Sequence, residues 1–228
     1  MTTTVADPAF VDLLVQADVL TFGDFVTKSG RPTPYFANFG NVRTGAHIAA
    51  LGRLYADRIV EVFGDDGVDV VFGPAYKGIP LAVAATSALA SDHGWDIGFA
   101  FDRKEAKDHG EGGTLVGHQL RDGDRVVIIE DVTTAGTSVR ETVPKLRAVA
   151  DVSVVGLVIG LDRQERGPSG DTSALDSLAA EFGLVGTSLA TIEQVVDQLV
   201  DRDIDGRVVL TSAHADRIAQ HLIEHGPR

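Results

Sequence analysis

The chain has 228 residues, of which 44% are hydrophobic, and a formal charge of -13 at pH 7. This composition suffices for one domain with a full core, whereas the acidity argues against a nucleic-acid partner, because phosphate backbones require a basic surface. The absence of cysteine excludes disulfides and thiolate metal sites. No stretch reaches the apolar length of a membrane span and no signal-peptide pattern opens the chain, so a cytoplasmic protein is expected.

The first forty residues predict one helix and two strands. Asp7 followed by Pro8 is typical of a helix start, with Asp7 as the cap. Between Thr21 and Phe39, aromatic residues flank a Lys-Ser-Gly-Arg-Pro segment, which predicts a strand, a tight turn and a second strand. Lys28 lies in this turn. From composition alone it is more simply a solvated turn residue than a binding residue.

A helix and a strand with a glycine-bounded loop follow. Thr44 to Phe63 has the spacing of an amphipathic helix that ends at Gly64, and Val68 to Phe72 predicts a buried strand. The loop from Gly73 to Gly78 leads into a helix expected from Pro80. A loop between a strand and a helix is a suitable place for an anion, although this one lacks the pattern of a Walker loop.

The next segment changes character abruptly. Trp95 to Phe101 predicts a third strand, whereas Asp102 to Gly113 has no apolar period and is expected to be a mobile loop. A solvated, disordered connection is one interpretation of such a mixture. The other is a cationic loop that closes over a polyanionic leaving group, for which the segment offers Arg103, Lys104, Lys107 and His109.

The most informative stretch runs from Arg125 to Ser138. Four β-branched residues, 126–129, predict a strand buried on both faces, and Glu130 and Asp131 follow at its end. The small and hydroxylated residues 133–138 then lead into a helix expected from Thr137, whose N-terminus and dipole favour a phosphate. An ordinary strand-to-helix turn is the alternative, since acids and threonine are common helix caps.

The last third of the chain predicts a helix, a strand and a helical C-terminal segment. Ser138 to Val149 is expected to be helical, with a kink or a break at Pro144, and Val152 to Leu161 predicts another apolar strand. Arg163 follows this strand, and its forked donors suit a planar carboxylate. Beyond residue 173 the pattern alternates helix, strand and helix without visible chemistry; Thr191 to Gln194 suggests a capping box and Ser212 a further cap.

Strands that alternate with helices predict a three-layer α/β fold with a mainly parallel sheet. We expect a single domain over residues 1–228, in which residues 1–40 form most of a small hood over the active site. The core is then expected at about 44–200, and residues 201–228 form a C-terminal helical segment.

Three segments resemble known families. Residues 130–137, Glu-Asp-Val-Thr-Thr-Ala-Gly-Thr, resemble the phosphoribosyl pyrophosphate motif of type I phosphoribosyltransferases. Residues 25–38 and the loop 103–113, Arg-Lys-Glu-Ala-Lys-Asp-His-Gly-Glu-Gly-Gly, are similar to segments of orotate phosphoribosyltransferases. The orotate ligands that this resemblance implies are Lys28, Phe36, Ala37, Thr134 and Arg163. The phosphoribosyl pyrophosphate ligands that it implies are Tyr76, Lys77, Arg103, Lys104, Lys107, His109, Glu130, Asp131, Val132, Thr133, Thr134, Ala135, Gly136, Thr137 and Ser138.

The resemblance also implies an activity. It is the Mg²⁺-dependent transfer of the ribosyl 5-phosphate group from phosphoribosyl pyrophosphate to orotate, which yields orotidine monophosphate and pyrophosphate for pyrimidine synthesis. Lys107, Asp131, Lys104 and His109 are the expected catalytic residues, with Mg²⁺ held mainly through substrate and water. A homodimer that shares the mobile loop across subunits is expected. The alternatives are a purine phosphoribosyltransferase and a non-catalytic sensor of phosphoribosyl pyrophosphate.

Overall fold

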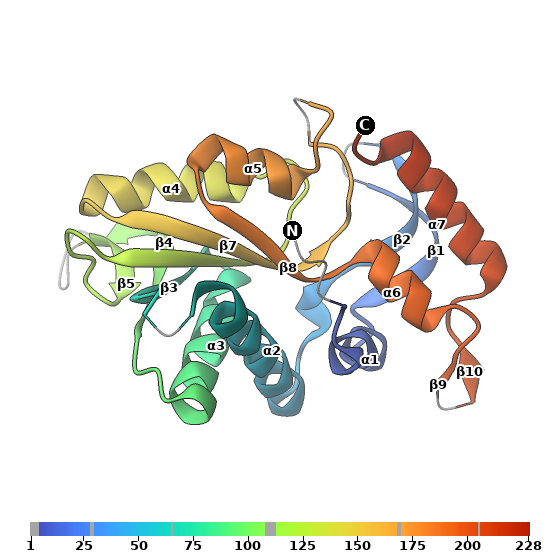
Figure 1. Ribbon diagram of the computed structural model, residues 1–228, viewed down its shortest axis with the longest axis horizontal. Coiled ribbons are helices and arrows are strands. Elements are labelled where there is room, and N and C mark those ends of the chain that lie inside the picture. The colour runs from blue at the N-terminus through green and yellow to red at the C-terminus, as the bar shows by residue number, and fades with distance from the viewer. Residues whose placement is uncertain (1–4, 28–29, 65, 108–112, 168–169, 205) are drawn as a thin grey trace.

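The computed structural model describes residues 5–27, 30–64, 66–107, 113–167, 170–204 and 206–228, with the backbone alone for 104–107 and 113. Its centre is a six-stranded sheet in the order β5-β4-β3-β6-β7-β8 (Figure 1). All neighbouring pairs are parallel except β4 and β5. The strands are β3 (Val70–Gly73), β4 (Gly98–Lys107), β5 (Gly113–Gly117), β6 (Arg125–Val132), β7 (Ser153–Asp162) and β8 (Val185–Thr191). The expected mainly parallel sheet is confirmed.

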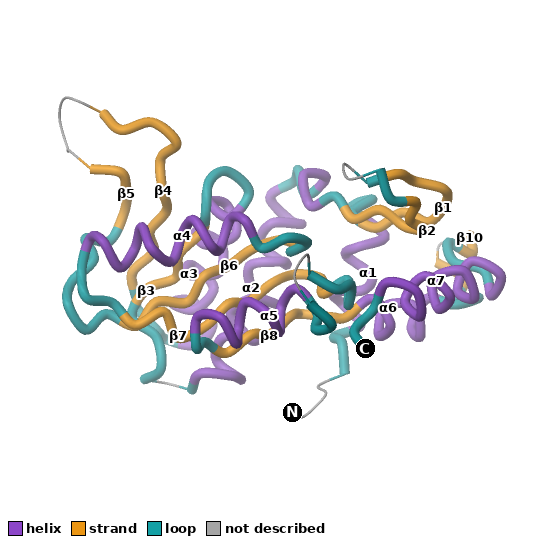
Figure 2. The backbone as a smooth tube through the Cα atoms, turned by 90° about the horizontal axis from the view of Figure 1, so that it is seen from above, coloured by secondary structure: helices purple, strands orange, loops and turns teal. Residues whose placement is uncertain are grey.

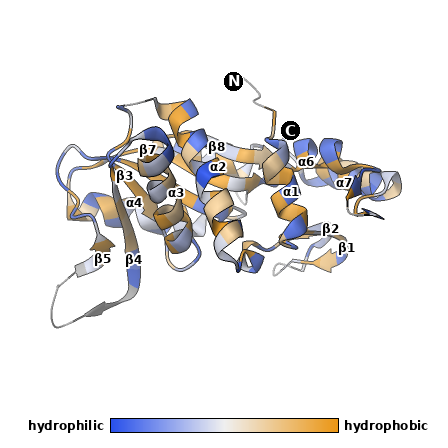
Figure 3. Cartoon of the chain, turned by 90° about the horizontal axis from the view of Figure 1, so that it is seen from below, coloured by the Kyte–Doolittle hydropathy of each residue, from blue (hydrophilic) through white to orange (hydrophobic). Residues whose placement is uncertain are grey.

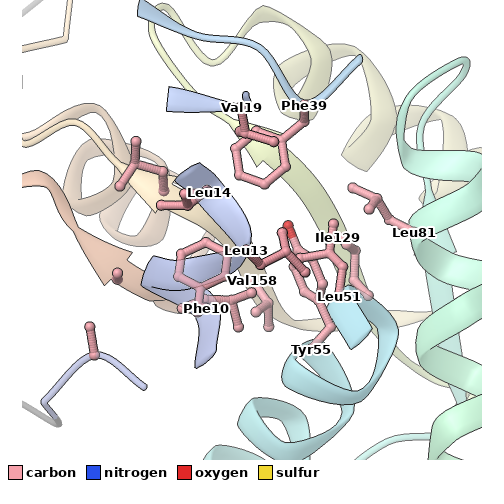
Figure 4. Packing of buried hydrophobic residues seen from close by; sticks show 14 of the residues in the cluster. Phe10, Leu13, Leu14, Val19, Phe39, Leu51, Tyr55, Leu81, Ile129 and Val158 are labelled. Carbon is pink, nitrogen blue, oxygen red and sulfur yellow. The ribbon is translucent and has the colours of Figure 1, made fainter. Parts of the chain in front are cut away.

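Helices cover both faces of this sheet, which completes the three expected layers (Figure 1). One face is covered by α2 (Gly45–Phe63) and α3 (Gly78–His93), the other by α4 (Thr137–Val149) and α5 (Ala174–Phe182). The strands are apolar on both sides, as buried parallel strands must be. Val127 and Ile129 belong to the core on the α2 side, where Ile129 lies near Leu51 and Tyr55 (Figure 4), while Val126 and Ile128 belong to the core on the α4 side.

A smaller unit lies beside the carboxyl end of the sheet. It contains the antiparallel pair β1 (Leu20–Val26) and β2 (Pro32–Ala37), which confirms the predicted strand-turn-strand. Around the pair lie α1 (Pro8–Gln16), η1 (Phe39–Asn41), α6 (Ile192–Leu199), β9 (Asp203–Ile204), β10 (Arg207–Val208) and α7 (Ser212–His225). Helix α7 packs against β2, so the C-terminal helix lies against the N-terminal strand pair. Hydrophobic and hydrophilic residues alternate along α1 and α2 (Figure 3), and the buried residues Leu51, Tyr55 and Ile59 recur every four positions of α2.

The largest difference from the sequence prediction is the segment after Phe101. An irregular loop was expected from Asp102, but β4 continues to Lys107 and pairs with β5, with Asp102 opposite Leu115 and Lys107 opposite Gly113. The two strands project from the sheet as an arm (Figure 2). The arm lacks the apolar alternation of a strand because it leaves the core, so the backbone pairing of β4 with β5 defines it.

The remaining differences concern the ends of elements and the C-terminal segment. β3 begins at Val70 and not at Val68, β4 begins at Gly98 and not at Trp95, and residues 201–228, expected to be helical, contain β9 and β10 before α7. Helix α3 begins at Gly78, two residues before the expected start, and the cap of α7 is Thr211 while Ser212 is already helical. Helix α4 continues through Pro144 to Val149, so the proline does not end it. The cap at Asp7 and the capping box of Thr191 and Gln194 are both confirmed.

Candidate active site

Four loops with candidate residues meet at one edge of the sheet. Strands β3, β4, β6 and β7 are parallel neighbours. Lys77 follows β3, Asp131 lies at the end of β6 and Arg163 follows β7, while Arg103 lies on β4 just beyond Phe101, the last residue that pairs with β3. In open α/β sheets this edge is where ligands bind, because loops and helix N-termini converge there. The topology therefore brings together residues that lie far apart in the sequence.

The closest contact at this edge joins Lys77 and Asp131. The Lys77 Nζ donates to Asp131 Oδ2 over 2.7 Å. The Asp131 side chain is buried, whereas about half of the Lys77 side chain is exposed, 52% by area. The loop after β3 and the end of β6 thus place a cation and an anion within one hydrogen bond of each other.

Glu130 is more deeply buried than an acid usually is. Only 8% of the residue is exposed, and the Tyr55 hydroxyl donates to its backbone carbonyl over 2.7 Å. Burial raises the pKa of Glu130 to about 7; a hydrogen bond with Ser138 acts in the opposite direction, and the neighbouring charge of Asp131 adds to the rise. At neutral pH this carboxyl group therefore changes its charge easily.

Gly136 and Arg140 stabilise the turn after β6. Gly136 has a φ of 69°, which is unfavourable for other residues, and it caps α4 without a side-chain hydrogen bond, so backbone N-H groups of the first turn remain for a ligand. Thr134, Thr137 and Ser138 are exposed around it. Arg140 donates to the Ala135 carbonyl and to Glu181, and the sequence prediction did not include it.

Asp102 connects the arm to the neighbouring loop. Its Oδ1 accepts from the Ala75 backbone N-H over 2.7 Å, and its Oδ2 lies 3.3 Å from Lys145 Nζ on α4. The Ala75–Tyr76 peptide bond is cis, and Tyr76 is 67% exposed. Asp102 therefore supports the loop that carries Tyr76 and Lys77.

Of the predicted arm residues, Arg103 is partly exposed at the base of the arm. Lys104 and Lys107 lie on β4 by their backbone, and His109 lies outside the described residues, as does Lys28 in the turn between β1 and β2. Phe36 is about half exposed, with its ring centroid 5.7 Å from that of Phe25, and Ala37 pairs with Leu20.

Arg163 is held by residues that the sequence did not indicate. Its Nη2 donates to Glu165 Oε1 over 2.7 Å, and its guanidinium carbon lies 5.4 Å from the centroid of the Tyr35 ring. A cavity of about 450 Å³ lies nearby, between the turn after β6 and the hood. Its lining residues are Arg31, Thr134, Ala135, Arg166, Gly167, Gly170 and His225, which include two arginines and no acid.

The donor set of this site fits a divalent cation bound mainly by its substrate. Glu130 and Asp131 offer carboxylate oxygens, which Mg²⁺ prefers, and they lie at the end of β6, directly before the turn of residues 133–138. In the part of the chain that the structure describes, no group of three or more metal-binding side chains converges. Two carboxylates suit a cation that keeps water and phosphate oxygens as its other ligands.

Comparison with known proteins defines the class of this site. Residues 42–190 match the family model of the phosphoribosyl transferase domain, so the chain belongs to the phosphoribosyltransferase family. It is 49% identical to an orotate phosphoribosyltransferase of Clostridium acetobutylicum over 217 residues, which are 95% of this chain and 96% of that protein. It is also 46% identical to one of Bifidobacterium longum over 222 residues, again 95% and 96% of the two chains. Within the family, the chain therefore belongs to the orotate phosphoribosyltransferases.

The fold agrees with this assignment. The crystal structure of orotate phosphoribosyltransferase from Francisella tularensis superposes with a TM-score of 0.80 at 34% sequence identity, covering 95% of this chain and 98% of the other. The resemblance stated from the sequence motifs is thereby confirmed. Among the described helices, none is long and apolar enough to cross a bilayer.

Proposed function

We propose that this chain transfers the ribosyl 5-phosphate group from phosphoribosyl pyrophosphate to orotate, in pyrimidine synthesis in the cytoplasm. The bond between ribose C1 and the pyrophosphate oxygen breaks, orotate N1 forms a new bond to C1, and the N1 proton is lost. The observation that supports this function best is the Lys77–Asp131 pair beside the turn of residues 133–138, which leads into the N-terminus of α4. It brings together a cation for pyrophosphate and an acid for the ribose.

The charges of the site follow from the reaction. As pyrophosphate leaves, positive charge grows on the ribose ring and negative charge on the departing oxygens. Glu130 and Asp131 lie at the end of β6, where their carboxylates can accept from the ribose hydroxyls. The 5-phosphate then binds in the turn of residues 133–138, through backbone N-H groups and hydroxyls. Lys77 and the arm serve the leaving group.

The arm supplies most of the cations. We propose that Arg103, Lys104, Lys107 and His109 bind pyrophosphate and stabilise its developing charge, with Lys107 as the most important. The hairpin form of β4 and β5 supports this role, because an arm that projects from the sheet edge can place its cations over a ligand. His109 acts as a fixed positive charge or as a proton donor to the leaving oxygen.

Orotate is proposed to bind between the hood and the turn after β6. Arg163 binds its carboxylate, Thr134 contacts the ring from the turn, and Lys28, Phe36 and Ala37 line the site from the hood. The cavity of about 450 Å³ contains Thr134, and its cationic lining suits an anionic base. A purine has no carboxylate that could pair with Arg163 or with Arg31 and Arg166, which line the cavity.

Mg²⁺ is the proposed cofactor. When bound, it would supply charge neutralisation at the leaving group. Glu130 and Asp131 are the residues beside which it would lie, directly or through water. Their own part is to hold the ribose hydroxyls in a fixed position.

One assay tests the proposed activity. The chain is incubated with Mg²⁺, phosphoribosyl pyrophosphate and orotate, and the loss of orotate absorbance is followed. Parallel reactions contain adenine, guanine or hypoxanthine in place of orotate. Consumption of orotate alone supports the proposal; consumption of a purine would indicate a purine phosphoribosyltransferase, and binding of phosphoribosyl pyrophosphate without any turnover would indicate a sensor.

A further inference from the structure

Glu165 is the centre of a buried cluster of which only Arg163 has a part in the proposed reaction so far. Only 6% of its side chain is exposed, and it receives four donors from three parts of the chain. Its Oε1 accepts from Arg163 Nη2 at 2.7 Å and from the Tyr35 hydroxyl at 3.1 Å, and lies 3.0 Å from His221 Nε2. Its Oε2 accepts from Arg31 Nη2. One carboxylate thus joins the end of β7, the hood strand β2 and helix α7.

The charges within this cluster do not cancel. Burial favours protonation of Glu165, but the hydrogen bond from His221 and the charges of Arg163 and Arg31 outweigh it and lower its pKa below the usual value. The carboxylate is therefore charged and opposes two guanidinium groups. One carboxylate faces two guanidinium groups, so at least one positive charge of the cluster has no partner of opposite charge. Buried charges are normally paired.

Two donors in the cluster also lack acceptors. The Nε atoms of Arg31 and Arg163 are buried, and neither has a hydrogen-bond partner among the described residues. Buried N-H groups are nearly always paired, so two such groups on neighbouring arginines indicate a place for an acceptor. An anion would satisfy both the unpaired donors and the excess charge.

The cluster opens toward the proposed base site. Arg31 lines the cavity of about 450 Å³ together with Thr134 and Ala135 of the turn after β6. Arg163, which holds the other unpaired Nε, shares Glu165 with it. The two arginines are thus oriented by one carboxylate, and one of them, Arg31, lines the cavity proposed for the base.

We propose that Arg31 and Arg163 together bind the carboxylate of the pyrimidine substrate, and that Glu165 is the positioning residue that holds both guanidinium groups for it. This inference rests on the proposed function, since it requires a base with a carboxyl group. Glu165 does not touch the substrate. It occupies one Nη2 of each arginine and so restricts how the remaining donors can turn.

The test compares two ligands that differ by the carboxyl group. Orotate and uracil are measured as competing ligands, and the ratio of their affinities is determined for the wild type, Glu165→Gln and Arg31→Gln. Glu165→Gln keeps the shape but removes the charge and turns an amide donor toward an arginine. We expect the preference for orotate to fall roughly tenfold or more in both variants, as for a lost charged hydrogen bond, with KM for phosphoribosyl pyrophosphate within about twofold.

Glu61→Gln is the matched control, because Glu61 also pairs with an arginine, Arg58, at 3.2 Å on the outer part of α2. Its ligand preference and both KM values should stay unchanged. Arg31 is more exposed than Glu165, so Arg31→Gln carries the test if Glu165→Gln does not fold. If the wild type is active and the folded variants keep the full preference for orotate over uracil, this inference alone is overturned. The same holds if a variant binds both ligands more weakly by the same factor. A wild type that does not consume orotate would overturn the proposed function and this inference with it.

Discussion

Lys77 Nζ lies 2.7 Å from Asp131 Oδ2, although 54 positions separate the two residues in the chain. The contact exists because β3 and β6 are parallel neighbours, with Val70 beside Val126, so that the loops after both strands begin at the same edge. Lys77, proposed for the leaving group, and Asp131, proposed for the ribose, therefore form a salt bridge with each other. A change at either residue should affect the binding of the same substrate.

Replacement of Asp131 by Asn should lower kcat by roughly a hundredfold or more, because it removes a charge placed where positive charge develops on the ribose. The measurement is steady-state kinetics with phosphoribosyl pyrophosphate and orotate. Asp57→Asn is a suitable control, since Asp57 also forms a short contact, 2.7 Å with His93, but lies on α2. Equal kinetics for Asp131→Asn and wild type would contradict the role of Asp131.

Glu130 should make stability depend on pH near neutrality. Its folded pKa of about 7 lies above the ordinary value of 4.5, so folding favours the protonated form. The contribution of Glu130 to the free energy of unfolding is fully present below the ordinary pKa. It is lost as the pH rises through the folded pKa, by up to about 3 kcal/mol. Urea unfolding at about pH 5 and about pH 8 should show this loss in wild type and not in Glu130→Gln. Parallel pH profiles for the two proteins would refute the assignment.

Asp102 should act mainly through the Ala75 backbone. Asp102→Asn keeps an oxygen for the Ala75 N-H, whereas Asp102→Ala leaves that donor unpaired and should raise KM for phosphoribosyl pyrophosphate more strongly. Lys145 is half exposed, so a double-mutant cycle of Asp102→Asn with Lys145→Met should give a coupling below about 1 kcal/mol. A larger coupling would mean that the ion pair, and not the backbone bond, holds the loop.

Lys107→Ala should reduce kcat by roughly a hundredfold or more, because the arm would lose a cation at the leaving group. Arg121→Ala is a suitable control, because it also removes one positive charge but lies after β5 and outside the arm. Single-turnover kinetics with excess enzyme would show whether the chemical step itself is slowed. A Lys107→Ala variant within a few-fold of wild type would remove Lys107 from the proposed mechanism.

A homodimer that shares its arms across subunits predicts complementation. Subunits with Lys107→Ala, mixed with subunits that carry Asp131→Asn, should regain part of the activity, because some mixed dimers contain one site with both native residues. Subunit exchange is verified by mass spectrometry of the mixture. Exchange without recovered activity would indicate that each arm serves its own subunit.

Much of the site could be predicted from local sequence. The β-branched run at 126–129, the acids at 130 and 131 and the small residues after them determine a buried strand, its end and a tight turn within about a dozen positions. Caps such as Asp7 and the Thr191–Gln194 box are local for the same reason, since donor and acceptor lie two or three residues apart. Neighbouring residues in the chain suffice to decide these features.

Only the tertiary structure determined the arm and the Glu165 cluster. The arm depends on backbone pairing between β4 and β5, which a polar segment does not reveal by its periodicity. Glu165 is 134 positions from Arg31 and 56 from His221, and the C-terminal helix that carries His221 shows no chemistry by itself. A single carboxylate gains its role from the donors that folding brings around it, and side-chain pairs so far apart are decided by packing, not by local sequence.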